Sequence, residues 1–157
     1  MEELPDEVHA KIQELCARGD ELAQSSQLAE ALKSYWAAWD LLPEPKTNWE
    51  AATWDSIGYI RNRLGDHRQA ITCYQRAIEL YRERADRYNE ADSLCSLGDL
   101  WQSIGESDAA CRAWGQALAI FDEIGHPDRE GVSARLADAR RQASNGSWQR
   151  ALSSRAG

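Results

Sequence analysis

The sequence predicts an all-α fold, a solenoid built from helical hairpins, and three observations support this. A unit of about 40 residues recurs along the chain. Apolar residues recur at helical spacing in both halves of each unit, as in Trp54, Ile57 and Ile60. All four prolines fall at the expected ends of helices or in connections. The 157 residues have the length of a single domain.

The repeat is defined by aligned positions of a few residue types. Gly19, Gly58 and Gly98 are 39 and 40 residues apart. The other aligned positions are two alanines and an aromatic residue, namely Ala31, Ala70 and Ala110; Tyr35, Tyr74 and Trp114; and Ala38, Ala77 and Ala117. A glycine within a helix costs about 1 kcal/mol relative to alanine. Its recurrence beside alanines therefore indicates close contact between two helices.

Each unit is expected to contain two helices, and the three units and a shortened fourth account for the chain. The expected bounds are about 8–43, 47–85 and 87–124 for the three repeats, and about 127–153 for a capping helix and a truncated fourth repeat with a short final helix. Gly65 and Gly105 mark breaks between paired helices, and Asp66 with Gln69 fits a capping box.

The end of the chain leaves two alternatives open. A terminal helix that covers the last core face is the expected cap of a solenoid. Leu136, Trp148 and Leu152 would complete such a cap, or they would leave an apolar edge for another chain.

The aligned positions resemble the tetratricopeptide repeat (TPR). Trp54, Ile57, Gly58, Ala70, Tyr74 and Ala77 match its pattern in order, as do Leu94, Leu97, Gly98, Ala110, Trp114 and Ala117. The resemblance implies a right-handed α-solenoid of helix-turn-helix repeats, in an extended variant of about 40 residues. The first third is similar to small stand-alone bacterial TPR proteins found near toxin and immunity genes, and the later units to those of bacterial regulatory proteins.

Charge is distributed unevenly along the chain. The net charge is −8, and residues 1–50 hold 11 of the 26 acidic residues. After Asp138 no acidic residue follows, whereas four arginines do, Arg140, Arg141, Arg150 and Arg155. An acidic start and a basic end would attract each other between molecules. Nucleic acid is not expected as a partner, because phosphate binding needs a clustered basic face.

No catalytic motif of the common hydrolases, kinases or metalloproteases occurs. We therefore expect a protein that is not an enzyme. The four cysteines and three histidines lack metal-ligand spacing, so no metal or other cofactor is expected. Reduced cysteines, an acidic start without a secretory signal and the lack of a long apolar run indicate a cytoplasmic protein away from membranes.

The resemblance implies that the first helices of successive repeats line a concave groove, and helical spacing selects the residues of that groove. The predicted peptide-binding residues are Gln13, Asp20, Asp55, Tyr59, Asn62, Arg63, Asp92, Asp99, Gln102 and Arg135, with Val132 and Ala139 beside Arg135. Asp55 and Asp99 are expected to pair with basic side chains of a ligand, while Asn62 and Gln102 hold its backbone.

Trp36 aligns with Gln75 and Gly115, so it is predicted to point outward on the second helix. An exposed indole would be an anchor for a partner on the convex face. The alternative is that Trp36 packs on Trp49 or on the N-terminal extension.

These observations predict a non-catalytic module that binds a protein or peptide, as an adaptor, sensor or inhibitor. The carboxylate clamp of co-chaperone TPR domains is absent, since Cys16, Asp20, Ser56, Asp92 and Ser96 stand at its positions. Two alternatives remain, a self-associating assembly protein and a bacterial antitoxin or immunity protein that binds a toxin. The expected oligomeric state is a monomer or a weak homodimer.

Overall fold

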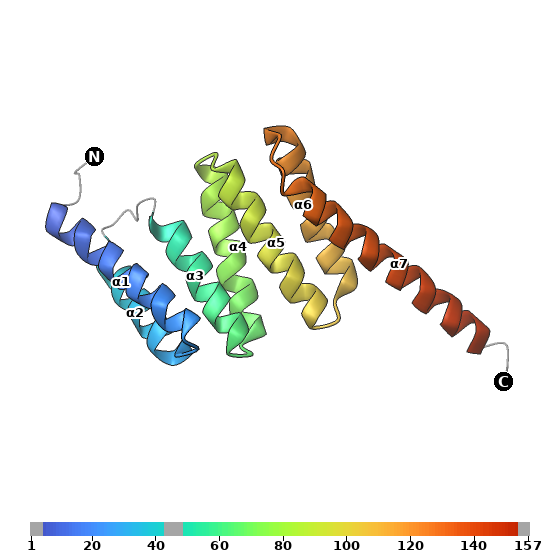
Figure 1. Ribbon diagram of the computed structural model, residues 1–157, viewed down its shortest axis with the longest axis horizontal. Coiled ribbons are helices and arrows are strands. Elements are labelled where there is room, and N and C mark those ends of the chain that lie inside the picture. The colour runs from blue at the N-terminus through green and yellow to red at the C-terminus, as the bar shows by residue number, and fades with distance from the viewer. Residues whose placement is uncertain (1–4, 43–48, 154–157) are drawn as a thin grey trace. The chain divides into compact units, whose positions relative to one another are not determined.

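The computed structural model describes residues 5–42 and 49–153, and of residues 145–153 it describes the backbone alone. These residues form seven helices and no strand (Figure 1). In chain order the helices are α1 (Asp6–Gln24), α2 (Leu28–Asp40), α3 (Trp49–Arg63), α4 (His67–Glu83), α5 (Arg87–Ser103), α6 (Ser107–Ile124) and α7 (Arg129–Ser153). The fold is the all-α helical repeat solenoid that the sequence predicts. Within the described ranges, no helix is long and apolar enough to cross a membrane.

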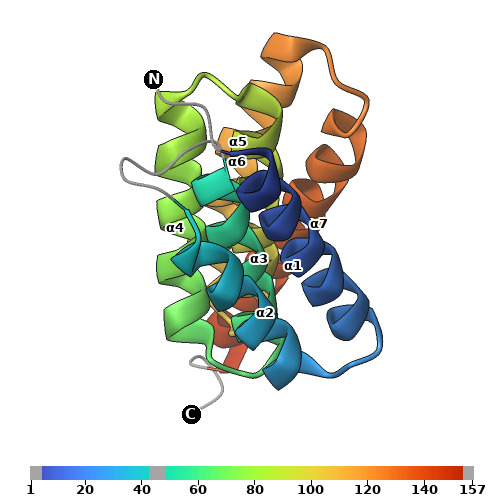
Figure 2. The ribbon, with the colours of Figure 1, turned by 90° about the vertical axis from the view of Figure 1, so that its left-hand side faces the viewer.

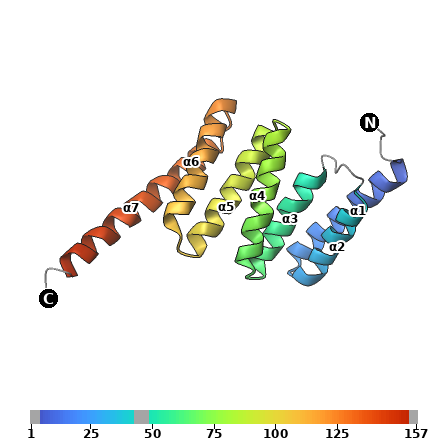
Figure 3. The ribbon, with the colours of Figure 1, turned by 180° about the vertical axis from the view of Figure 1, so that it is seen from behind.

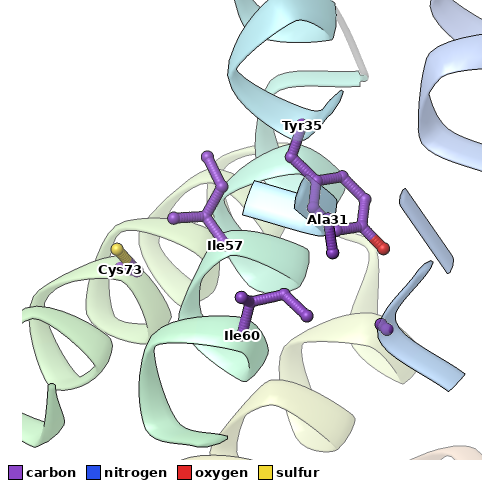
Figure 4. Close-up of a cluster of buried hydrophobic side chains, with 6 residues drawn as sticks. Ala31, Tyr35, Ile57, Ile60 and Cys73 are labelled. Carbon is purple, nitrogen blue, oxygen red and sulfur yellow. The ribbon is translucent and has the colours of Figure 1, made fainter. Parts of the chain in front are cut away.

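The chain divides into two compact units, Met1–Ala85 and Asp86–Gly157. In the first unit α1 packs against α2 and α3 against α4, and α2 lies beside α3 (Figures 2 and 3). All four helices contribute to one core, which contains Ala23, Ala31, Tyr35, Ile57, Ile60 and Cys73 (Figure 4). In the second unit α5 packs against α6, and α7 packs against α6.

The turn inside each hairpin has the same backbone geometry. The first residues after α3 and α5 lead into Gly65 and Gly105, which have φ angles of 84° and 85°. Ser26 occupies the equivalent place after α1 at a φ of 61°. At each turn the next amide bonds back to a carbonyl five residues earlier, as from Asp66 to Arg61 at 2.9 Å. This is the Schellman arrangement, which satisfies helix-end carbonyls through one left-handed residue.

The recurring glycines lie directly against the recurring aromatic rings. A Cβ added at Gly98 would stand 2.5 Å from the Trp114 ring, and one at Gly19 would stand 2.8 Å from the Tyr35 ring. At Gly58 the distance to Tyr74 would be 3.2 Å. The six aligned alanines of the paired helices are fully buried. The prediction of close helix–helix contact at these positions is confirmed.

The capping box predicted at Asp66 is not formed. Its side chain makes no capping hydrogen bond to α4. The Asp66 carboxylate instead accepts a hydrogen bond from Arg61 at 2.9 Å, and a charged partner competes effectively with a backbone amide. A side-chain cap occurs at α5, where Asp86 accepts from the Asn89 amide at 3.3 Å.

The described part of α7 covers the last core face of the second unit. Val132, Leu136 and Ala139 are buried at helical spacing, whereas Asp138 and Arg141 are exposed on other sides and pair with each other. Placing Val132 and Ala139 in the binding groove was therefore wrong, because their side chains complete the core. Burial of Leu136 and a polar outer side are what a capping helix requires.

The separate short final helix predicted for the C-terminal segment is not formed, since α7 continues to Ser153. One glycine in a helix costs only about 1 kcal/mol, so Gly146 does not by itself end the helix. The predicted cap residues Trp148 and Leu152 have side chains outside the described residues.

Two glycines of the second unit provide a matched test of the glycine–aromatic contact. Gly98→Ala is expected to lower the free energy of unfolding by about 1–3 kcal/mol, because the new methyl group overlaps the packed Trp114 ring. Gly115→Ala, also within a helix, meets nothing within 4 Å and should raise stability by up to about 1 kcal/mol. Urea denaturation followed by circular dichroism measures both. Equal effects of the two substitutions would contradict the assignment.

Candidate functional site

The first candidate surface lies on α1 and α3, and we call it the first-unit face. It carries the predicted residues Gln13, Asp20, Asp55, Tyr59, Asn62 and Arg63. Arg63 joins the two helices, because its Nη1 donates to the Ala23 carbonyl oxygen at 2.7 Å. Ala23 lies in the last turn of α1, whose carbonyl groups carry a partial negative charge that a guanidinium stabilises.

Several predicted ligand contacts on the first-unit face are used within the chain. The Tyr35 hydroxyl donates to the Asp20 carboxylate. Asn62 Oδ1 lies 3.1 Å from His67 Nδ1. Asp55 is half-buried and also has an interaction within the chain. These three side chains are therefore held in place by the fold, and their roles toward a ligand stay predictions.

Tyr59 is the large exposed side chain of the first-unit face. It is 47% exposed, and the Arg63 guanidinium carbon lies 5.6 Å from the centre of its ring. This distance is within the range of a cation–π contact. Arg63 Nη1 also donates to the Tyr59 hydroxyl at 3.4 Å. These contacts orient the ring while leaving part of its apolar area exposed, as a protein-binding surface requires. Gln13 of α1 is exposed as well.

The second candidate surface lies on α5 and α7, and we call it the second-unit face. Arg135 of α7 donates to both carboxylate oxygens of Asp99 on α5 at 2.9 Å. Asp99 Oδ1 also accepts from Trp114 Nε1 at 3.0 Å. The base that meets Asp99 is thus one of the chain's own arginines, and this pair joins α7 to α5. Gln102 is half-buried, and its Oε1 has no hydrogen-bond partner among the described residues.

The electrostatics of the second-unit face centre on Asp92. Desolvation and the nearby Asp128 carboxylate raise the pKa of Asp92, and the Arg135 guanidinium opposes this shift. Burial raises the pKa of the Cys95 thiol to about 12. Because the thiolate is the reactive form of cysteine, Cys95 is poorly suited to nucleophilic chemistry. The described residues contain no group of three or more potential metal ligands.

Trp36 is half-buried and does not point outward. Its ring packs edge-on against Trp39 and Trp54, at centroid distances of 6.3 and 5.8 Å. Trp39 and Trp54 themselves lie 4.8 Å apart. The predicted outward orientation is therefore wrong, whereas a role for Trp36 in binding a partner stays a prediction. Trp49, the alternative packing partner, contacts His9 instead. Alignment placed Trp36 outward because the smaller Gln75 and Gly115 occupy its position in the other repeats.

Two residues of the second-unit face escaped the sequence analysis. Tyr88 is 42% exposed and lies one helical turn before Asp92 on α5, a spacing that the sequence does contain. Asp128 lies in the connection between α6 and α7, where no helical periodicity indicates which way a side chain points. Its proximity to Asp92 depends on how α7 packs.

Comparison with known proteins places part of the chain in one family of repeats. A family model described as tetratricopeptide repeat matches residues 49–123. The chain is 29% identical over 77 residues to the Tonsoku-like protein of Danio rerio and 33% identical over 64 residues to the regulatory protein AfsR of Streptomyces griseus. These matches span 49% and 41% of this chain but only 5% and 7% of the two relatives.

Solved structures share the fold. The TPR2AB domain of yeast Sti1, in a complex with pHSP90, has a TM-score of 0.75 at 18% identity and covers 88% of this chain and 50% of its own. PcrH, solved in complex with the chaperone binding region of PopB, has a TM-score of 0.65 at 20% identity and covers 88% and 99%.

Arg63→Ala is expected to lower the free energy of unfolding by about 1–2 kcal/mol, because it removes a charged hydrogen bond to the end of α1. The control Arg68→Ala removes an exposed arginine of α4 and should change stability by less than about 0.5 kcal/mol. Urea denaturation measures both variants. Unchanged stability in Arg63→Ala would show that this arginine does not join α1 to α3.

Trp36→Ala is expected to lower the free energy of unfolding by about 2–4 kcal/mol, because it opens a space beside Trp39 and Trp54. Gln75→Ala, at the aligned exposed position of α4, should change stability by less than about 0.5 kcal/mol. Thermal unfolding of both proteins measures the difference. A stability loss as small as that of the control would contradict the packing of Trp36 against Trp39 and Trp54.

Proposed function

Because the chain is a tetratricopeptide repeat protein, we propose that it is a non-catalytic module that binds a protein or peptide through its first-unit and second-unit faces. The observation that carries this proposal is that exposed side chains lie beside residues held in place by contacts within the chain. Tyr59 and Gln13 are exposed, and Asp20, Asn62 and Arg63 are held by contacts within the chain. A surface held in place before binding loses less conformational freedom when it binds.

The structural neighbours support the class of partner. The yeast Sti1 domain is in a complex with pHSP90, and PcrH is in complex with the chaperone binding region of PopB. Protein or peptide is accordingly the partner class that we propose for this chain, with a role as adaptor, sensor or inhibitor. The four free cysteines accord with a reducing compartment, and we propose the cytoplasm.

Self-association is the less favoured alternative. The described outer side of α7 carries exposed Asp138 and Arg141, which pair with each other. Charged residues are depleted from the centres of stable interfaces, so this side of the helix is a poor surface for a second copy. Light scattering across protein concentrations would identify a monomer, and a stable dimer at low micromolar concentration would favour self-association instead.

A site-specific capture experiment tests the proposed function. A photo-crosslinking benzoylphenylalanine replaces Gln13, Tyr59 or, as the outer-surface control, Gln75 of α4, and each protein is irradiated in extract from the native cells. We expect the same partner to be crosslinked from positions 13 and 59 but not from position 75. Tyr59→Ala should weaken capture about tenfold, the effect of losing an aromatic anchor, while Gln75→Ala leaves it unchanged. Crosslinks from position 75 alone, or from no position, would contradict the proposal.

A further inference from the structure

The second-unit face contains an aromatic and acidic surface that none of the contacts described above accounts for. Tyr88 packs against His126, with ring centroids 4.9 Å apart, and Phe121 lies 6.2 Å from Tyr88. The His126 and Phe121 rings thereby hold Tyr88 in place although it remains 42% exposed. Asp92 follows one helical turn later on the same side of α5.

Asp92 and Asp128 bring two carboxylates to this ring. They are close enough for Asp128 to raise the pKa of Asp92. Both carboxylates also raise the pKa of the Tyr88 hydroxyl. His126 Nδ1 accepts the Asp128 amide hydrogen at 3.3 Å and also lies 3.4 Å from Asp128 Oδ2, so this imidazole forms an ion pair with Asp128 only when it is protonated. The surface therefore brings two carboxylates to an oriented aromatic ring.

The arginines around this surface pair with other acidic residues. Arg135 pairs with Asp99 at 2.9 Å and Arg129 with Asp122 at 3.0 Å. A third arginine, Arg87, bonds to Glu90 and Glu123. Among the described residues, no lysine or arginine forms an ion pair with Asp92 or Asp128. A cation supplied from outside the chain would reduce the repulsion between the two carboxylates.

We propose that Tyr88, Asp92 and Asp128 form a subsite for one cationic side chain, lysine or arginine, of the segment bound by the second-unit face. The two carboxylates supply hydrogen-bond acceptors, and the exposed part of the Tyr88 ring supplies a surface for the alkyl stem and the charge. This assignment rests on the proposed function and specifies the chemistry of its ligand.

The test uses small probes, so that it does not depend on an identified partner. Nuclear magnetic resonance follows the full chain during titration with N-acetyl-lysine-methylamide, and with N-acetyl-norleucine-methylamide as the uncharged probe. We expect saturable shifts at Tyr88, Asp92 and Asp128 with the lysine probe, and several-fold smaller shifts with norleucine. Each of Asp92→Asn and Asp128→Asn should weaken binding of the lysine probe about fivefold, the usual worth of one partly exposed ion pair.

Asp108→Asn is the matched control, because it removes the same charge from an exposed position on α6 of the same unit. It should change binding of the lysine probe less than twofold, because a distant exposed charge is screened by solvent and salt. Equal shifts with norleucine, no shift at Tyr88, or equal weakening by the control would each overturn the subsite. Near-native circular dichroism of the two aspartate variants separates a lost subsite from a lost fold.

The subsite and the proposed function fail in different ways. If the wild type crosslinks a partner and the double variant Asp92→Asn/Asp128→Asn captures that partner equally well, the subsite is not used. The proposed function then stands. If no position crosslinks a partner, the proposed function is contradicted whatever the lysine probe does. Capture that falls in the aspartate variants and persists in Asp108→Asn supports both.

Discussion

The contact on which each repeat depends is a glycine of the first helix packed beneath an aromatic ring of the second. Gly98 and Trp114 form the tightest case, where an added Cβ would stand 2.5 Å from the ring. The missing side chain lets the two backbones approach closely, and fully buried alanines such as Ala110 and Ala117 continue the approach along the hairpin. Protein interiors are packed too densely to absorb an added methyl group here without movement.

The same aromatic residues connect the core to the binding faces. The residue after the glycine is Asp20 in the first repeat and Asp99 in the third. Tyr35 donates to Asp20, and Trp114 Nε1 donates to Asp99 at 3.0 Å. In the second repeat Tyr59 occupies this position. The second repeat therefore presents an aromatic side chain, whereas the first and third present a carboxylate that is hydrogen-bonded within the hairpin. The first-unit face thereby gains its exposed aromatic side chain.

Charge on the second-unit face follows from which acidic residues the arginines engage. Asp99 forms an ion pair with Arg135. Asp128, together with desolvation, raises the pKa of Asp92, and Asp92 and Asp128 both raise the pKa of the Tyr88 hydroxyl. Exposed ion pairs contribute little to stability, so the consequence of this pairing concerns specificity. It leaves Asp92 and Asp128 without a lysine or arginine ion pair among the described residues, and in the proposed subsite this would favour a cationic ligand group.

The sequence by itself determined the fold. The periodic apolar positions, and the glycines and alanines that recur at the positions of Gly98 and Ala110, form their contacts within one helical hairpin, between residues that are near in the chain. It also contained the spacing of fifteen residues between Asp20 and Tyr35 and between Asp99 and Trp114, whereas the hydrogen bonds between them became evident only in the structure. The tertiary structure alone decided that Trp36 packs on other indoles and that Asp128 meets Asp92. These contacts depend on packing between helices and on the path of a connection, and neither leaves a periodic signal in the sequence.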